Sequence, residues 1–356
     1  MPDFPWDVLA PFSRRAAEHP GGIVDLSVGT PVDPTPEVAQ RALAAASNAP
    51  GYPTVAGTPA LREACAGWLQ RRLGVDIDPV AVMPSIGTKE LVAALPLLMG
   101  LSEQSHIVGP LTAYPTYAVS AGVLGARFTP TDDVESVSDA DFIWLNSPSN
   151  PTGRVLDPER LRAIVVWARE RGIPVVSDEC YIELGWDVEP RSILHPSIVG
   201  TDHTGVVALH SLSKRSNLAG YRFGFAAGDP AVIATITGIR KHLGMMVPAP
   251  VQAAAIAALD DDAHAVEQKA RYRARREILR AALLSAGFTI DHSEAGLYLW
   301  ATRHEDCWDT VAWGAERGVL VTPGAFYGES GREHVRVAMT ATDERVEAFA
   351  ERVSAG

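Results

Sequence analysis

The sequence predicts an α/β fold, with a mostly parallel sheet in a large domain and a smaller α+β domain beside it. The middle of the chain alternates short apolar runs with helical patterns, which is typical of parallel strands joined by helices. After Pro250 the pattern changes to one long helical stretch at 263–286, followed by strands and helices in mixed order. The chain has 356 residues, 47% of them hydrophobic, which is enough for one large core and a second smaller one.

The expected strands of the large domain are short apolar or β-branched runs bounded by turn residues. They lie at 81–84, 106–109, 141–145, 173–177, 205–209 and 221–228. Helical patterns fill the intervals at 90–99, from Thr116 onward and at 158–171. Gly100 and Gly172 end two of these helices, because glycine is favoured just past a helix C-terminus. We therefore expect an open sheet with helical crossovers.

The C-terminal part has strand-like runs at 288–290, 297–301, 318–321 and 334–339, with helices near 306–317 and at the end of the chain. The N-terminal segment ends in IVDLSVG (23–29), which has no partner strand nearby, so we expect it to pack on the C-terminal part. The predicted large domain is 31–262. The predicted small domain is 1–30 plus 263–356, including the long interdomain helix.

Composition and charge exclude several classes of protein. The chain carries 31 basic and 43 acidic residues, a net charge of −12, which argues against a nucleic-acid surface. Cys65, Cys180 and Cys307 lie far apart, so we expect free thiols rather than a disulfide framework. The N-terminus has prolines and acids where a signal peptide needs a basic start and an apolar run. We expect a cytoplasmic protein with no membrane span.

Common site motifs are absent. The ten histidines are scattered and form no HExxH or CxxC cluster, so no metal site is expected. The chain has no GxGxxG, GxxxxGK[ST] or GxSxG, which removes the usual dinucleotide, P-loop and serine-hydrolase interpretations.

The segment SLSKRSNLAGYRFGF (211–225) is the first that indicates chemistry. Lys214 follows a strand-like run and lies in a polar loop that contains a glycine. A lysine that forms a Schiff base must be held where its amine reaches an aldehyde. Ser211 and Arg222 can fix a phosphate beside it. The alternative is a lysine in a surface loop.

Two further segments place polar residues at strand ends, where open α/β sheets bind ligands. In LNSPSNPTGRV (145–155), Asn150 lies in a proline-flanked turn just after a strand. In VVSDECY (175–181), Asp178 ends a buried strand and Tyr181 follows three residues later. An aspartate there can keep a pyridinium nitrogen protonated, which makes the ring an electron sink. We expect Cys180, between these two, to point to the other face and to be structural.

A third segment, PSIGTKE (84–90), offers an anion site. Gly87, Thr88 and Lys89 open a helix, and the backbone amides at a helix N-terminus suit a phosphate. Lys89 itself can equally be a solvated lysine.

Taken together and in this order, these segments resemble the fold-type I, pyridoxal-phosphate (PLP)-dependent enzymes of the class I/II aminotransferase family, along nearly the whole chain. The resemblance implies that Lys214 holds PLP and then moves protons. It implies that Asp178 pairs with the ring nitrogen, and that Asn150 and Tyr181 hydrogen-bond the ring hydroxyl oxygen. The residues implied to hold the phosphate are Gly87, Thr88, Ser211 and Arg222, with Lys89 as an additional candidate.

The same resemblance assigns residues outside these segments. Tyr114, in LTAYPTY, matches the aromatic that stacks on the pyridine ring, with Tyr117 as a rival. Tyr52, in GYPTVAGTPALR, matches a tyrosine that reaches the phosphate of the neighbouring subunit, which implies a homodimer with shared active sites. Arg336, in HVRVAM, matches the arginine that clamps the substrate α-carboxylate. Gly29, in LSVGTP, is expected to bring a backbone amide to the same carboxylate.

Aminotransfer is the leading hypothesis for the reaction, because a carboxylate clamp and a proton-carrying lysine suit reversible proton transfer at the substrate Cα. A PLP-dependent carbon–sulfur β-lyase uses the same fold and nearly the same residues, and stays open. The aminotransferase-like sensor domain of a transcription factor would need a DNA-binding domain ahead of residue 1, for which we expect no room.

At subfamily level the sequence resembles succinyldiaminopimelate aminotransferases of lysine biosynthesis. The segments that carry this resemblance are IGTKELVAALP (86–96), SDECYIELGW (177–186), SLSKRSNLAGYR (211–222) and RKHLGMMVPAPVQ (240–252). It implies glutamate as amino donor, 2-oxoglutarate as its product, and a long substrate with a distal carboxylate. Arg240 and Lys241 could anchor that carboxylate or form a surface pair at a helix end. The alternative is a broad-specificity amino-acid aminotransferase.

Overall fold

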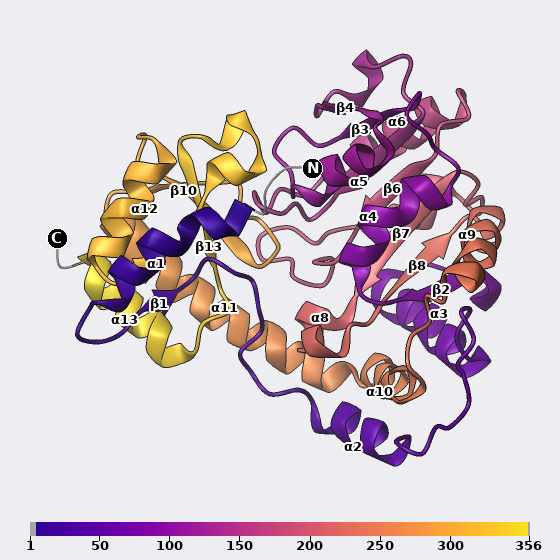
Figure 1. Ribbon diagram of the computed structural model, residues 1–356, viewed down its shortest axis with the longest axis horizontal. Coiled ribbons are helices and arrows are strands. Elements are labelled where there is room, and N and C mark those ends of the chain that lie inside the picture. The colour runs from indigo at the N-terminus through magenta and orange to yellow at the C-terminus, as the bar shows by residue number, and fades with distance from the viewer. Residues whose placement is uncertain (1–4, 355–356) are drawn as a thin grey trace.

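The computed structural model describes residues 5–354, and its largest unit is a seven-stranded sheet with helices packed against it (Figure 1). The strand order is β2-β8-β7-β6-β5-β3-β4. Neighbouring strands are parallel from β7 to β4, and β8 is antiparallel to both β7 and β2. The strands are β2 (Val82–Ser85), β3 (His106–Gly109), β4 (Arg127–Pro130), β5 (Phe142–Asn146), β6 (Val175–Asp178), β7 (Val206–Ser211) and β8 (Gly224–Gly228). This confirms the mostly parallel α/β sheet expected from the sequence.

The central strands are buried along their whole length. Every position of β5, β6 and β7 is buried, as expected of parallel strands covered on both faces. The apolar residues at the start of each of these strands made them visible in the sequence. In contrast, β4 was missed, because this edge strand is only partly buried and carries arginine, threonine and proline.

The helices packed with this sheet precede, connect or follow its strands. They are α2 (Glu37–Ala45), α3 (Pro59–Leu73), α4 (Thr88–Leu98), α5 (Thr116–Leu124), α6 (Pro158–Arg169), α7 (Pro196–Val199), α8 (Leu212–Arg215), α9 (Pro230–Leu243) and α10 (Ala249–Asp260). Short 3₁₀ turns lie at η1 (Pro5–Leu9), η2 (Pro79–Ala81), η3 (Val134–Ser136), η4 (Ala219–Tyr221), η5 (Gly324–Tyr327) and η6 (Glu329–Gly331). The helix α4 begins two residues earlier than expected, directly after Gly87, whose φ of +73° is a left-handed value that favours glycine.

The second unit is built around a four-stranded antiparallel sheet of order β12-β13-β10-β9. Its strands are β9 (Thr289–Asp291), β10 (Tyr298–Thr302), β12 (Thr322–Pro323) and β13 (His334–Ala338), and its helices are α1 (Ala10–Ala17), α12 (Cys307–Glu316) and α13 (Asp343–Ser354). A separate parallel pair joins β1 (Val24–Asp25) to β11 (Val319–Leu320). The N-terminal segment therefore packs on the C-terminal part.

The helix α11 (Asp262–Ser285) runs between the two units (Figure 1). Asp261 caps its first turn by accepting a hydrogen bond from the Ala263 amide. Near its middle, Arg275 forms a buried, two-point ion pair with Asp33, which lies shortly before α2. We propose the domain boundaries expected from the sequence, 31–262 and 1–30 plus 263–356, with residues 1–4 and 355–356 lying outside the described residues.

Two other expectations concern the chain as a whole. Cys65, Cys180 and Cys307 are all free thiols. None of the helices within residues 5–354 combines the length and the apolar character needed to cross a membrane.

Candidate functional site

A cavity of about 300 Å³ lies where β5, β6 and β7 end. Asn146, Asp178 and Ser211 are the last residues of these three strands, and all three line it. The carboxyl edge of a parallel sheet is where open α/β folds bind ligands. Eleven of the residues singled out from the sequence line this catalytic cavity: Gly29, Thr88, Lys89, Tyr114, Asn150, Asp178, Tyr181, Ser211, Lys214, Arg222 and Arg336.

Lys214 lies in the short helix α8, directly after β7, so its amine is brought to the sheet edge. Its Nζ donates a hydrogen bond to the Gly29 carbonyl. Burial lowers the pKa of the Lys214 amine, and the neighbouring cations Arg222 and Arg336 act in the same direction. Within residues 5–354 no carboxylate pairs with this amine. A buried lysine with a lowered pKa is uncharged, and hence nucleophilic, at lower pH than a solvated one.

Asp178 is a buried carboxylate that lacks a cationic partner among the described residues. Its Oδ2 accepts a hydrogen bond from the Tyr117 hydroxyl at 2.9 Å, and its Oδ1 accepts one from the Cys180 amide at 3.2 Å. Burial raises the pKa of Asp178, and these hydrogen bonds oppose the rise. A buried carboxylate in a cavity is stabilised by a cation that binds there, such as a protonated ring nitrogen.

Tyr114 and Tyr117, the two candidates for the aromatic that stacks on the pyridine ring, have different surroundings in the structure. Tyr117 is 1% exposed and holds Asp178. Tyr114 is half-buried and lines the cavity, with the Lys89 amine 5.7 Å from its ring centroid. Tyr117 also lines the cavity, but its hydroxyl is bound to Asp178, so we keep Tyr114 as the proposed ring-stacking residue.

The expectation for Cys180 was wrong. Its side chain lines the cavity, with Sγ 3.0 Å from the Thr88 hydroxyl, rather than pointing to the other face. The strand β6 ends at Asp178, so the alternation of side chains along a strand no longer applies two residues later. Burial raises the pKa of this thiol, and the Asp178 charge adds to the rise. The thiol is therefore neutral near pH 7.

The start of α4 and the loop after α8 form a cationic cup. The first amides of a helix have no partner within the helix and attract anions. Arg222 lies against Gly87, where a Cβ would be 2.5 Å from its Nη2, so Gly87 makes room for the guanidinium without lining the cavity. Thr88 begins α4, and the Ser211 hydroxyl accepts from the Ser213 amide at 3.1 Å. Hydroxyls, helix amides and a guanidinium together suit a phosphate.

Arg336 lies in β13, which is flanked by β12 and β10, and is only 2% exposed. Its Nη1 donates to Asn150 Oδ1 at 2.9 Å and its Nη2 donates to the Ser27 carbonyl at 2.7 Å. No Asp or Glu among the described residues pairs with it. A buried guanidinium without an anion is costly, and a carboxylate is its natural two-point partner.

Tyr298 is a site residue that the sequence analysis missed, although it lies in an expected strand. Its hydroxyl is 3.2 Å from the Tyr181 hydroxyl, and its ring centroid is 3.9 Å from Arg336 Cζ. A Cβ at Gly29 would overlap the Tyr298 hydroxyl, which explains the glycine there. Burial alone would raise the pKa of Tyr298, but Arg336 and Lys214 hold that pKa below its ordinary value. Only the pairing of β10 with β13 brings Tyr298 to this site.

Three further candidate residues, Tyr52, Arg240 and Lys241, lie outside the catalytic cavity. Tyr52 is 96% exposed, in the loop between α2 and α3, and does not line the catalytic cavity of its own chain. Arg240 is fully buried and its Nη1 is 2.5 Å from Glu90 Oε1, so it is neither a distal-carboxylate anchor nor part of a surface pair. Its neighbour Lys241 is exposed and lies outside the cavity.

The residues present fit PLP. A half-buried amine, a buried carboxylate and a cationic cup face one cavity, and they match the aldehyde, ring nitrogen and phosphate of that cofactor. Lys214, Asp178 and Arg222 would hold these three groups, and Tyr114 would face the ring. Within residues 5–354 no group of three or more His, Cys, Asp or Glu side chains could hold a metal ion.

Comparison with known proteins agrees with this geometry. The model of the family "Aminotransferase class I and II" matches residues 22–353. The chain is 57% identical to 4-dedimethylamino-4-oxo-anhydrotetracycline transaminase OxyQ from Streptomyces rimosus, over 99% of both chains. It is 58% identical to the probable aminotransferase Rv1178 from Mycobacterium tuberculosis, over 99% of this chain and 85% of the relative. The probable N-succinyldiaminopimelate aminotransferase from Thermus thermophilus superposes with a TM-score of 0.89 at 30% identity, over 99% of this chain and 100% of that one. The chain therefore belongs to the class I and II aminotransferase family and is a PLP-dependent aminotransferase.

Proposed function

We propose that this enzyme exchanges amino groups between α-amino acids and 2-oxo acids, with glutamate and 2-oxoglutarate as one substrate pair. The observation that supports this proposal is the buried Arg336 guanidinium, which lines the catalytic cavity and has no carboxylate partner among the described residues. Every amino acid and 2-oxo acid presents a carboxylate, so one clamp can serve both half-reactions.

The chemistry that bound PLP supplies is withdrawal of electrons from the substrate Cα, which makes the Cα–H acidic. Lys214 has the lowered pKa expected of a group that takes up and returns that proton. Asp178 keeps a proton on the ring nitrogen, and Arg336 fixes the orientation of the Cα–H bond. Asn150 connects the carboxylate clamp to the rest of the cavity lining, because its side-chain oxygen accepts a hydrogen bond from Arg336.

The second substrate pair has two candidates. N-Succinyl-LL-2,6-diaminopimelate, as in lysine biosynthesis, is supported by the sequence segments given above and by the likeness to the Thermus thermophilus structure. A bulky ketone is supported by 57% identity to OxyQ, which is named for an anhydrotetracycline ketone. The buried Arg240–Glu90 pair removes one of the two possible anchors for a distal carboxylate, which weakens the support for the first candidate.

A panel of amino donors and oxo acceptors distinguishes these candidates, with glutamate formation measured when 2-oxoglutarate is the acceptor and 2-oxoglutarate formation measured when glutamate is the donor. Turnover of N-succinyl-LL-2,6-diaminopimelate with 2-oxoglutarate would support the first, and turnover of large ketones would support the second. Release of pyruvate and ammonia from cystathionine, without any 2-oxo acid, would instead indicate a carbon–sulfur lyase.

The Arg336→Lys variant tests the carboxylate clamp. A lysine cannot reproduce the two parallel hydrogen bonds of a guanidinium. Losing a charge-assisted hydrogen bond costs roughly 1.5–3 kcal/mol, or about 10- to 150-fold in binding. We expect the KM of glutamate and that of the oxo acid to rise together by this factor, while the PLP absorbance stays intact.

Arg276→Lys is the matched control, because Arg276 is also buried but binds Asp187 and the Ser293 carbonyl, outside the cavity. It should change thermal stability without changing either KM. If Arg336→Lys raises the KM of only one substrate, then Arg336 binds the side chain of that substrate. The α-carboxylate clamp would in that case lie elsewhere.

We further propose a homodimer with shared active sites, in which Tyr52 serves the phosphate of the partner subunit. Its support is the exposure of Tyr52, whose side chain reaches no cofactor site in its own chain. Sedimentation should show a dimer, and Tyr52→Phe should release PLP more readily at unchanged dimer affinity. A fully active monomer would contradict the proposal.

A further inference from the structure

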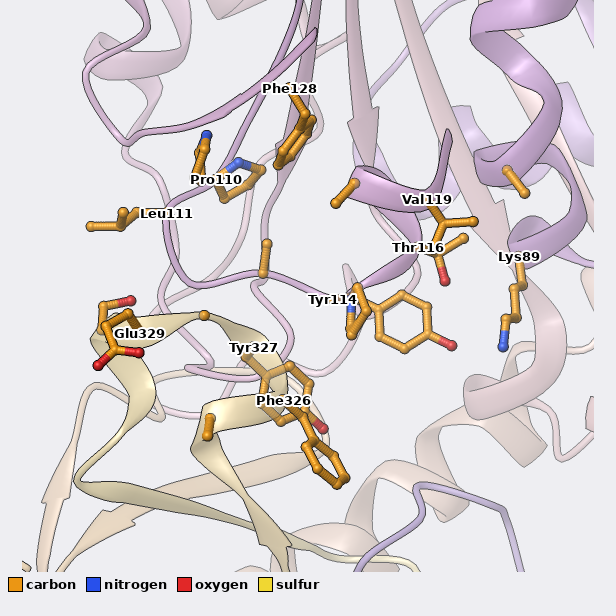
Figure 2. A pocket seen from close by; sticks show the side chains of 18 of the residues that line it. Lys89, Pro110, Leu111, Tyr114, Thr116, Val119, Phe128, Phe326, Tyr327 and Glu329 are labelled. Atoms are coloured by element: carbon orange, nitrogen blue, oxygen red, sulfur yellow. The ribbon is translucent and has the colours of Figure 1, made fainter. Parts of the chain in front are cut away.

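A second cavity, of about 1010 Å³, lies between α5, the loop 110–115 and the segment 325–330 (Figure 2). Its volume is at the upper end of the roughly 300–1,000 Å³ typical of ligand pockets. The rings of Trp6, Phe128, Phe326 and Tyr327 line it. Its lining is largely apolar, and Lys89 and Glu329 are the charged side chains on it.

This apolar cavity adjoins the catalytic cavity. Trp6, Lys89 and Tyr114 line both. Arg336 Cζ lies 5.1 Å from the Tyr327 ring centroid and 6.0 Å from that of Trp6. The apolar cavity therefore begins one aromatic ring away from the guanidinium that is suited to the substrate carboxylate. A substrate held at Arg336 can extend its side chain past these rings.

The aromatic rings are arranged to receive another ring. Trp6 and Phe326 meet edge to face at 5.4 Å between centroids, and Trp6 and Tyr114 are tilted at 6.5 Å. Aromatic side chains favour such edge-to-face and offset contacts with a further aromatic group. A charged distal group would lose its hydration against these rings, so the lining selects apolar groups over polar ones.

We infer that the apolar cavity binds the side chain of bulky aromatic or fused-ring substrates, and that such 2-oxo acids are preferred acceptors. This inference rests on the proposed function, because it assumes that Arg336 holds the substrate carboxylate. It commits the site to a flat, apolar group joined by a short linker to a 2-oxo acid.

Two tryptophan substitutions on the same helix test it. Ala118 of α5 lines the apolar cavity, so Ala118→Trp fills part of it. Val123→Trp is the matched control, since Val123 is 48% exposed on α5 and does not line the cavity. With glutamate as donor, we expect Ala118→Trp to lower kcat/KM for 3-(2-naphthyl)pyruvate by about tenfold or more, because the naphthyl ring loses aromatic contact area in the filled cavity. Activity toward oxaloacetate should change less than about twofold, and Val123→Trp should affect neither acceptor.

A second variant guards against a folding defect. Ala93→Leu adds volume to the same cavity from α4, and it should show the same selective loss. Equal losses for both acceptors, or no loss for either in these variants, would overturn the inference.

Binding without turnover separates this inference from the proposed function. The probe is 3-(2-naphthyl)propanoate, which carries the carboxylate and the ring but no keto group, titrated calorimetrically into the holoenzyme. We expect about tenfold weaker binding to Ala118→Trp than to the wild type or to Val123→Trp. If that pattern holds while no acceptor receives an amino group, the proposed function fails and the cavity assignment stands. If all three proteins bind the probe equally, the cavity assignment fails even where amino transfer is normal.

Discussion

Replacing Lys214 with alanine should abolish useful amino transfer. Loss of proton transfer at the substrate Cα alone should lower kcat by roughly 10²–10⁴-fold. The Lys214 amine is suited to that step because burial lowers its pKa and no carboxylate among the described residues neutralises it. Stopped-flow measurement of a single half-reaction with glutamate, at saturating PLP, is the direct test.

The control for this variant is Lys269→Ala. Lys269 is partly buried against Trp186, with its Nζ 5.9 Å from the ring centroid, and does not line the catalytic cavity. It should retain the half-reaction rate of the wild type. A Lys214→Ala enzyme that keeps more than about a tenth of kcat would contradict the assigned role, since general acid–base catalysis contributes at least about 10²-fold.

Asp178→Asn should be nearly as damaging, with PLP still bound through the phosphate cup. Breaking a buried charge pair costs roughly 3–5 kcal/mol, which corresponds to about 10²–10⁴-fold in rate. Asparagine keeps the size of the side chain but cannot stabilise a protonated ring nitrogen. Absorbance titration should show retained PLP, and turnover with glutamate should show the loss.

Glu179→Gln is the matched control, because it changes a neighbouring buried acid that the cavity does not include. Its carboxyl accepts a hydrogen bond from the Ile193 amide at 2.7 Å. Burial raises the pKa of Glu179 to about 8, so the group is largely neutral at pH 7 and glutamine resembles it. This variant should keep its kcat. A normal kcat in Asp178→Asn would remove Asp178 from its role.

The sequence was informative where chemistry and local pattern coincide. The strands β5, β6 and β7 begin with apolar residues and end with polar ones, so Asp178 and Lys214 could be found together with their place at a sheet edge. Arg336 was identified through its motif in β13, although its burial could not be read from five residues of strand.

Residues positioned by long-range contacts were not predictable in this way. Tyr298 meets Arg336 only through the register of β10 on β13, which no local pattern sets. Arg240 looked like a helix-end surface residue, but α9 and α4 pack so that it is buried on Glu90. Cys180 was misplaced because the strand ends two residues before it. The apolar cavity unites segments more than two hundred residues apart, so it emerges only in the folded chain.

The central claim, that Lys214 holds PLP, is tested most directly by reducing the holoenzyme with borohydride and mapping the labelled peptide. The chain has four lysines, Lys89, Lys214, Lys241 and Lys269, so the assignment is unambiguous. Lys89 is the sharpest rival, because it lines the same cavity. We expect one phosphopyridoxyl group per chain, on Lys214. A label on Lys89 or on either of the other two lysines would contradict the claim.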